Sequence, residues 1–363
     1  MSSNSIGHIF RLTSFGESHG KLMGGVIDGC PAGIKIDIGL IQYELSRRKA
    51  SHPIFESSRN ESDEFEFVSG LFEGITTGTP LAYIINNKNH ISSDYEAIKD
   101  IYRPSHADYT YQEKYGIRDY RGGGRASARE SVIRIVAGSI AKQILSKYNI
   151  NIIAFVSQIG IHSLKEIPLN VEKETIEQSP VRCPDIELSK LILHYLLEIK
   201  NNGDTVGGVV NCVIQNIPIG IGSPIYGKLQ AELAYALFSI NAVKGFEYGA
   251  GFNSANMKGS EMNDEFIITQ KTKSKHISTK TNFSGGIQGG ISNGEDIYFR
   301  LAFKPAPSIG LAQNTVDKYG NQSVLNIKGR HDICFVPRAV PVVEAMTAIV
   351  LLDQFMLNKT VKM

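Results

Sequence analysis

A glycine- and arginine-rich stretch at residues 118–134 is the part of this sequence best suited to binding an anion. Its three consecutive glycines, Gly122, Gly123 and Gly124, allow positive φ angles and let the backbone come close to a ligand. A helix is predicted to follow, and a helix start supplies free N–H groups and the positive end of a dipole. Four arginines lie in the same stretch: Arg121, Arg125, Arg129 and Arg134. We therefore expect a multiply charged anion here, the alternative being a glycine-rich connector before a surface helix.

The helix predicted after these glycines has a buried face. Ser127 and Glu130 are spaced like a capping box, and apolar residues recur at helical intervals: Val132, Ile133, Val136, Ile140 and Ile144. Arg125 and Arg129 stand four apart and should share one helical face, where like charges repel unless something negative lies between them. This spacing is a second reason to expect a polyanionic ligand.

Two histidines and one aspartate are candidates for proton transfer near neutral pH. His19 lies in a tight polar turn, 16–20, which should hold it at the end of a sheet. His106 follows a proline and is predicted near a helix start, where the dipole disfavours the charged imidazole. Asp332 ends the segment Gly-Arg-His-Asp. For His106 the alternative is a capping or packing role.

Composition limits the class of protein. The 363 residues are 42% hydrophobic and 20% charged, which is typical of a soluble globular chain, and the net charge of +2 argues against nucleic-acid binding by bulk charge. The four cysteines show no CxxC or zinc spacing, which favours a reduced intracellular chain. No signal pattern is present, and the longest apolar run contains Pro341 and Glu344. We expect a cytoplasmic protein without a membrane span.

Strands and helices are predicted to alternate along the chain. The predicted strands are 6–13, one through 26–27, 64–69, 81–86, 150–161, one opening at 205–210, and 296–303; the predicted helices are 37–49, 107–116, 127–148, 171–178, 188–200, 228–240 and 340–357. Loops are expected at 50–63, as a mobile segment or lid, at 241–245, at the polar excursion 253–280 and at the glycine-rich 284–294. Glycine-bearing strands in both halves hint at an internal duplication.

These residues indicate an enzyme that acts on a small polyanion by acid–base chemistry, with phosphate as the expected leaving group. No GxGxxG follows the first strand and no GxxxxGK[ST] occurs, which argues against the standard dinucleotide and P-loop folds. The basic run Arg47, Arg48 and Lys49 could also be a solvated helix end.

Five blocks of the sequence resemble the signatures of the chorismate synthase family. They are GESHG at 16–20, RPSHADYTYQEKYGIRDYRGGGRASARE at 103–130, NAVKGFEYG at 241–249, GGIQGGISNGE at 285–295 and GRHD at 329–332. The blocks occur in family order and span essentially the whole chain.

The resemblance implies an α+β fold, a β-α-β sandwich of antiparallel sheets with outer helices, formed by a single domain over 1–363 and assembled as a homotetramer, a dimer of dimers. It implies the last step of the shikimate pathway, in which 5-enolpyruvylshikimate 3-phosphate loses phosphate and a ring proton in a 1,4-elimination. The family needs reduced FMN without net redox change. Because no reductase domain is visible, we expect an external flavin reductant rather than intrinsic NADPH-dependent reduction.

The resemblance also assigns roles by motif. The expected catalytic residues are His19, His106 and Asp332. The expected substrate-binding residues are Ser18, Arg48, Arg103, Ser127, Arg129, Arg134 and Arg330. The expected FMN-lining residues are Arg125, Ala126, Ser127, Asn241, Ala242, Gly289, Lys304, Pro305, Ala306, Pro307, Ser308 and Arg330. No metal site is expected.

The chain departs from the family pattern at a few positions. Ile54 stands where a second substrate-binding arginine is usual, and isoleucine cannot bind an anion. Arg59, His52 or Lys49 could replace it, and we expect Arg59 to do so. Lys49-Ala50 replaces the usual arginine and proline, while Ile333 and Ser131 are milder changes.

Two other classes of protein would use the same residues differently. A non-catalytic polyanion- or RNA-binding module would show a broad basic surface and salt-sensitive binding. A conventional flavin oxidoreductase would consume reduced cofactor stoichiometrically.

Overall fold

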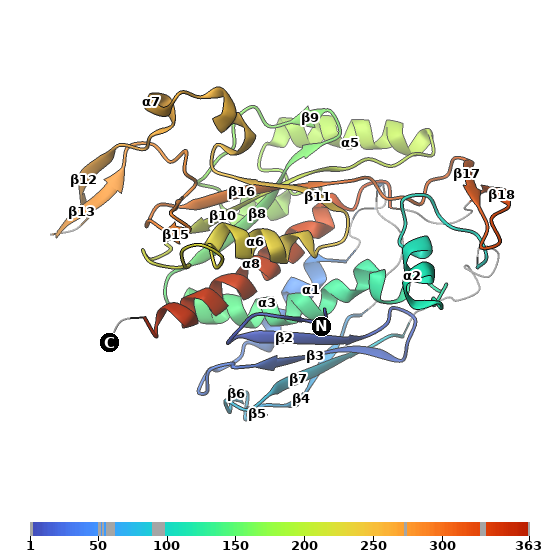
Figure 1. Ribbon diagram of the computed structural model, residues 1–363, viewed down its shortest axis with the longest axis horizontal. Coiled ribbons are helices and arrows are strands. Elements are labelled where there is room, and N and C mark those ends of the chain that lie inside the picture. The colour runs from blue at the N-terminus through green and yellow to red at the C-terminus, as the bar shows by residue number, and fades with distance from the viewer. Residues whose placement is uncertain are drawn as a thin grey trace.

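The computed structural model describes residues 3–49, 52, 54–55, 62–88, 99–271, 274–326 and 332–361. Two five-stranded antiparallel sheets enclose a layer of helices, and further helices and hairpins lie outside the second sheet (Figure 1). The predicted α+β sandwich is therefore confirmed. One cluster of buried apolar side chains reaches from the first sheet through the helices to the second. The single domain over 1–363 stays a prediction.

The first sheet has the order β1-β2-β3-β7-β4. Its strands are β1 Ser5–Ile6, β2 Arg11–Gly16, β3 Leu22–Asp28, β7 Leu81–Asn86 and β4 Phe65–Ser69. Side chains alternate between a buried and a more exposed face, as in β7, where Leu81, Tyr83 and Ile85 are fully buried. The Tyr83 hydroxyl donates to the Ile133 carbonyl at 2.6 Å, which ties this sheet to the helix layer.

The second sheet has the order β11-β16-β10-β8-β9. Its strands are β11 Val243–Tyr248, β16 Ile297–Phe303, β10 Gly208–Gln215, β8 Asn151–Ile159 and β9 His162–Ser163. The middle strands are nearly continuous in buried apolar residues because both of their faces are covered. The helix layer packs on one face, and Val171 and Ile176 pack on Phe155 and Val213. The first sheet is formed from residues 5–86 and the second from residues 151–303, so each sheet comes from its own continuous part of the chain, and the internal duplication stays a prediction.

The helix layer contains α1 Ile38–Arg47, α3 Ser131–Ser146, α6 Leu229–Phe238 and α8 Val336–Asn358. A Cβ on Gly138 would lie 2.4 Å from Ala345, so α3 and α8 pack with almost no space between their backbones. By length and composition α8 could cross a membrane, but 89% of its most apolar window is buried inside the protein. Its apolar composition is accounted for by the core.

The remaining elements belong neither to the two five-stranded sheets nor to the helix layer. They are the helices α2 Asp108–Tyr115, α4 Lys173–Gln178, α5 Ile186–Asn201 and α7 Gly259–Met262, the 3-10 turns Gly124–Ala126, Ala128–Glu130 and Gly251–Asn256, and the strands β5 Leu71–Phe72, β6 Ile75–Thr76, β12 Phe266–Lys271, β13 Ser274–Thr279, β14 Ile287–Gln288, β15 Ile291–Ser292, β17 Gln313–Val316 and β18 Gln322–Leu325. The hairpin β12–β13 lies within the excursion that the sequence places on the surface, and it projects from the body in Figure 1.

Most predicted elements are confirmed, and several bounds are wrong. The first predicted strand is interrupted at 7–10 because the buried carboxylate of Asp353 accepts the N–H groups of His8, Ile9 and Phe10 at 2.7–3.0 Å. The predicted loop 241–245 already contains the start of β11 at Val243. The last helix begins at Val336 and contains Pro341. Most of the predicted lid at 50–63 lies outside the described residues.

The predicted capping box is also wrong. Ser127 accepts a hydrogen bond from the N–H of Arg129 at 3.3 Å and caps a 3-10 turn, and α3 begins only at Ser131. The Glu130 carboxylate accepts instead from Ser14 Oγ at 2.9 Å. Because two separate 3-10 turns precede α3, Arg125 and Arg129 do not share a helical face.

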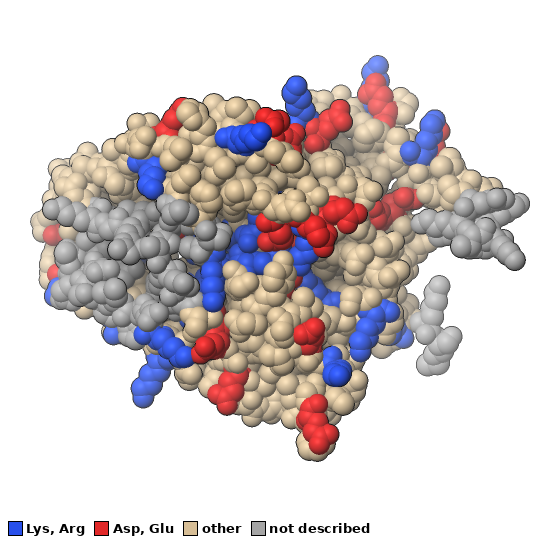
Figure 2. All heavy atoms as spheres, turned by 180° about the vertical axis from the view of Figure 1, so that it is seen from behind, with Lys and Arg blue, Asp and Glu red and all other residues tan. Residues whose placement is uncertain are grey.

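Charges of both signs are scattered over the face shown in Figure 2, apart from basic side chains that gather in one hollow near its middle. Among the described residues on this face there is no broad basic surface, which the nucleic-acid-binding alternative requires.

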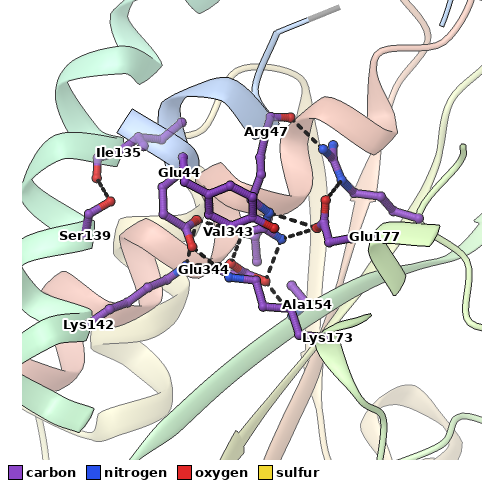
Figure 3. Close-up of polar contacts among 12 residues, drawn as sticks. Glu44, Arg47, Ile135, Ser139, Lys142, Ala154, Lys173, Glu177, Val343 and Glu344 are labelled. Carbon is purple, nitrogen blue, oxygen red and sulfur yellow. Dashed lines mark hydrogen bonds and ion pairs between the residues drawn. The ribbon is translucent and has the colours of Figure 1, made fainter. Parts of the chain in front are cut away.

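A buried ion-pair network joins the layers (Figure 3). The carboxylate of Glu344, in α8, accepts from Arg47 Nη1 of α1 at 2.6 Å and from Lys142 Nζ of α3 at 2.5 Å. Its second oxygen accepts from the backbone N–H of Ala154 in β8 at 3.1 Å. Lys142 also contacts Glu44 at 3.2 Å. One carboxylate therefore connects two helices and the second sheet to α8.

Candidate active site

The glycine loop lies against both candidate histidines. A Cβ on Gly122 would lie 2.0 Å from Cε1 of His19, and a Cβ on Gly123 would lie 3.4 Å from Cε1 of His106. The φ angles of Gly122, Gly123 and Gly124 are 61°, 86° and 53°, so the loop needs glycine for its backbone as well as for space. Two imidazoles that are 87 positions apart in the sequence thus contact neighbouring residues of one loop.

The turn that carries His19 is buried against this loop. Ser18 is fully buried, its N–H donates to the Gly124 carbonyl at 3.4 Å, and its Oγ lies 3.0 Å from Nδ1 of His19. The side-chain amide of Asn87 donates to the carbonyls of Glu17 and Gly20 at 3.0 and 2.9 Å. These contacts fix the turn at the end of β2, as the sequence predicts.

A chain of hydrogen bonds connects the His106 segment to three other loops. Lys304 Nζ donates to the Ser105 carbonyl at 2.6 Å, and the N–H of Lys304 donates to the Ala242 carbonyl at 3.0 Å. The Asn241 amide donates to the Ala126 carbonyl at 2.8 Å. Segments 105–106, 241–242 and 304 therefore meet the glycine loop at one place.

Two arginines meet on the buried carboxylate of Asp63. Arg48 Nη2 donates to one oxygen at 2.8 Å, and Arg129 Nη1 donates to the other at 2.5 Å. Arg129 Nε also donates to Asn87 Oδ1 at 3.0 Å. Burial alone would raise the pKa of Asp63, but the charges of Arg48 and Arg129 outweigh it and hold that pKa below its usual value.

A second buried carboxylate, that of Asp108, gathers three cationic or proton-carrying side chains. Arg103 donates to it through Nε and Nη2 at 2.7 and 2.9 Å, and Arg118 Nη1 lies 2.9 Å from Oδ1. Nδ1 of His106 lies 3.0 Å from the same oxygen. Burial would raise the pKa of Asp108, but the hydrogen bonds from Arg103 and His106 hold it far below its usual range.

Asp332 is connected to the Asp63 cluster through Arg338. Arg338 Nη1 donates to Asp332 Oδ1 at 2.8 Å, and its Nε donates to the carbonyl of Arg48 at 3.1 Å. The N–H of Val206 donates to the Ile333 carbonyl at 2.9 Å, while Thr205 Oγ1 donates to the Ala306 carbonyl at 2.8 Å. These contacts therefore form one closed ring, which joins eight segments of the chain: 304–306, 332–333, 48, 63, 87, 17–20, 122–124 and 105–106.

The other arginines of the glycine-rich stretch have separate partners. Arg125 donates to Ser14 Oγ at 2.9 Å, Arg134 donates to Glu130 at 2.5 Å and to Ser239 Oγ at 2.8 Å, and Arg121 pairs with Asp119 at 2.8 Å. The structure therefore corrects the expectation that all four crowd one place. Arg125 and Arg134 line a cavity of about 1050 Å³, together with Ala126 and Asn241.

Gly289 lies apart from this ring. Its neighbour Gly290 packs on Lys228, just before α6, whereas Asn241 follows the other end of that ten-residue helix, about 15 Å away. No contact among the described residues brings Gly289 to the glycine loop. For Pro305, Pro307 and Ser308 the structure places the backbone beside the ring, and Arg330 lies outside the described residues.

Strained backbone is found at two positions in the ring and at a third, Ala242, that contacts it. Ser105, Ala242 and Asp63 have φ angles of 57°, 68° and 49°, which side-chain-bearing residues rarely adopt. Such strain persists where surrounding contacts fix it, and it clusters at functional sites. Its position here agrees with the ring as the site.

Sequence reasoning missed Asp63, Asn87 and Asp108, which orient the cations, and Arg118 and Arg338, which bind the carboxylates of Asp108 and Asp332. The one local signal was Asp108 in the first turn of a predicted helix, close to His106.

Two of the candidate substitutes for an arginine at position 54 have other partners. Lys49 Nζ donates to the Ser62 carbonyl at 2.8 Å, and His52 stacks on Phe55 with ring centroids 4.9 Å apart. Arg59 lies outside the described residues.

Comparisons with known proteins agree on one family. The chorismate synthase family profile matches residues 10–356. Curated proteins named chorismate synthase are 54% identical in Phocaeicola vulgatus, over 99% of both chains, and 55% identical in Christiangramia forsetii, over 100% of both chains. A crystal structure of chorismate synthase is similar with a TM-score of 0.76 and 32% identity, covering 97% of this chain and 93% of that one.

Proposed function

The chain belongs to the chorismate synthase family, and we propose that its ring of loops binds 5-enolpyruvylshikimate 3-phosphate beside reduced FMN. The activity is that of a carbon–oxygen lyase, which makes chorismate in the shikimate pathway to the aromatic amino acids. In this 1,4-elimination a ring C–H bond and the C–O bond to phosphate break, and a proton and phosphate leave. The existing ring double bond shifts and a second one forms, so that the ring becomes a conjugated diene. The observation that carries the proposal is the closed ring of contacts around the glycine loop.

The cations of the ring suit a substrate with two carboxylates and a phosphate. Arg48, Arg103 and Arg129 are at least nine-tenths buried, and each is oriented by an aspartate. A buried guanidinium forks around an anion with about 1.5–3 kcal/mol per charge-assisted hydrogen bond. Arg134, Ser18 and Ser127 are proposed to add contacts, and Arg330 is proposed by motif alone.

The proton carriers divide the chemistry. His19 is proposed to protonate the departing phosphate, since it is buried beside Ser18 next to the glycine loop. His106 is proposed to hold a proton on the cofactor side, and Asp332, anchored by Arg338, to assist removal of the ring proton. Each such transfer contributes about 10²- to 10⁴-fold to the rate.

The ring also fits a flavin phosphate. Burial lowers the pKa of Lys304, and the charge of nearby Lys244 lowers it further. An anion beside these two lysines would therefore be stabilised. The isoalloxazine of the flavin is proposed to lie against Ala126, Ser127, Asn241, Ala242 and the loop 304–308. When bound, reduced FMN supplies electron density that helps the phosphate leave and is recovered without net oxidation.

One assay distinguishes this function from its alternatives. The protein is incubated anaerobically with the phosphorylated enolpyruvyl substrate and photoreduced FMN, and phosphate release and flavin absorbance are followed together. We expect many phosphates released per flavin with no net flavin oxidation. Stoichiometric oxidation would identify an oxidoreductase, and salt-sensitive RNA binding without turnover would identify a binding module.

Arg59 is proposed to bind the substrate anion that an arginine at position 54 would otherwise hold. Ile54 is half-buried and packs on the core, so it leaves no cation at that point. Arg59→Ala is expected to raise the KM for the substrate about tenfold, the effect of one lost charge-assisted contact, with kcat nearly unchanged. An unchanged KM would show that another residue does this work.

Assembly, location and reductant are proposed from the family. We expect a homotetramer, a cytoplasmic location, and an external flavin reductant rather than NADPH used by the chain itself. Aerobic turnover with NADPH and FMN alone would contradict the last of these.

A further inference from the structure

Asp108 is the most highly connected carboxylate beside the proposed site. It is 4% exposed, and both its oxygens are engaged: one by Arg103, the other by Arg103, Arg118 and Nδ1 of His106. Arg118 is itself fixed by the Lys99 carbonyl, which accepts from its Nη2 at 2.6 Å. The carboxylate therefore cannot turn away from His106 without breaking two ion pairs.

The environment of His106 leaves its two ring nitrogens with different surroundings. Nδ1 is buried and lies 3.0 Å from Oδ1 of Asp108, in an ion-pair contact whose geometry falls outside that of an ordinary hydrogen bond. The opposite edge of the ring, Cε1 and Nε2, faces Gly123, where an added Cβ would lie 3.4 and 3.6 Å away. An ionised carboxylate can only accept, so a proton on Nδ1 makes this contact attractive, whereas a bare Nδ1 lone pair would face a negative oxygen.

We propose that Asp108 is a positioning residue that keeps the proton of neutral His106 on Nδ1, so that Nε2 faces the glycine loop as the atom that exchanges protons, and that the same carboxylate fixes Arg103. The inference rests on the proposed function for its catalytic meaning, but the tautomer itself is a property of the free protein. The low pKa of Asp108 agrees with a carboxylate that stays ionised throughout.

The direct test is ¹⁵N NMR of the histidine side chains in the free protein, with the His106 signal assigned from its loss in His106→Gln. The parent is expected to show the Nδ1–H tautomer at a pH where the imidazole is neutral. In Asp108→Asn the amide can donate to Nδ1, and the signal is expected to shift toward the Nε2–H tautomer. A parent in the Nε2–H form would overturn the proposal whether or not any variant folds.

Steady-state kinetics distinguish the two proposed roles of Asp108, which are to orient His106 and to fix Arg103. Asp108→Asn is expected to lower kcat by about 10²-fold, within the range of a lost acid–base group, and to raise KM because Arg103 is released. In the double variant with His106→Gln, kcat should stay within about threefold of His106→Gln alone, since both changes remove one function. Multiplied kcat losses would mean that Asp108 does not act through His106.

Controls exclude a general structural effect. Asp353→Asn alters a buried carboxylate that accepts the N–H groups of His8, Ile9 and Phe10 at 2.7–3.0 Å and has no described contact with His19 or His106, so its kcat should stay within about twofold of the parent. Asp108→Glu keeps the charge and should recover part of both kcat and the Nδ1–H signal. If Asp353→Asn lost as much kcat as Asp108→Asn, the effect would be structural.

Discussion

Replacing Gly122 with alanine is expected to lower kcat by about 10²-fold or more. The new methyl would lie 2.0 Å from Cε1 and 2.3 Å from Nδ1 of His19, so the ring or the loop must move by roughly an ångström. A displacement of that size in a catalytic group can cost about 10²-fold. Steady-state chorismate formation with photoreduced FMN measures the loss, and circular dichroism checks that the variant is folded.

The control for this prediction is Gly74→Ala. Gly74 has φ 76°, similar to the 61° of Gly122, but nothing lies within 4 Å of an added Cβ. Both variants therefore place a side chain on left-handed backbone, which destabilises the fold by about 1–2 kcal/mol, but only Gly122→Ala displaces His19. Gly74→Ala should lose stability and keep its kcat. Equal kcat losses in both would show that the position of His19 does not govern turnover.

Elements with local signals were predictable from the sequence. The helix predicted over 37–49 is confirmed as α1, and Asp37 caps it by accepting from the N–H of Leu40 at 2.9 Å. The alternation in β7 and the periodicity of α5 likewise lie within one element, where propensity and burial agree. Such patterns specify which face is buried, and the core then forms from those faces.

The partners of the site cations were not predictable. Arg129 meets Asp63 across 66 positions, and Arg338 meets the Arg48 carbonyl across 290. Nothing in the local sequence of either residue records such a pairing, because it depends on how the sheets and helices pack. Motif spacing therefore identified the cations but not the carboxylates that orient them. The four-residue spacing of Arg125 and Arg129 misled for a similar reason, since two 3-10 turns replaced the expected helix.

The two glycine-rich loops show a limit of composition. Both contain glycines at positive φ, but only the loop at 122–124 contacts the candidate histidines. The loop with Gly289 packs beyond the far end of α6, where its glycines allow close contact with Lys228 and β11. Glycine content predicts a tight backbone, and the fold decides what lies beside it.

Replacing Glu344 with glutamine is expected to lower the free energy of unfolding by about 3–5 kcal/mol. The change removes the counter-charge that Arg47 and Lys142 share inside the helix layer (Figure 3), where each side chain is at most 16% exposed. Urea unfolding at fixed protein concentration measures the difference. Glu187→Gln is the control, because its pair with Lys190 is 81% and 67% exposed and should change stability by less than about 0.5 kcal/mol.

The pH dependence of this difference tests its electrostatic origin. Burial would raise the pKa of Glu344, but Arg47 and Lys142 outweigh it and hold that pKa far below its usual range; the same cations, with Lys173, lower the pKa of Glu44 to about 2. A carboxyl whose pKa is lowered on folding stabilises the protein above its unfolded pKa, near 4.5, and loses that contribution as pH falls through the folded value. The difference in the free energy of unfolding between the parent and Glu344→Gln should therefore be largest at pH 7. It should become smaller below about pH 4.5, because the parent then loses a charge interaction that the variant never had. A difference in unfolding free energy that stayed constant down to pH 3 would mean that shape and hydrogen bonding at position 344, rather than charge, join α1, α3 and the second sheet to α8.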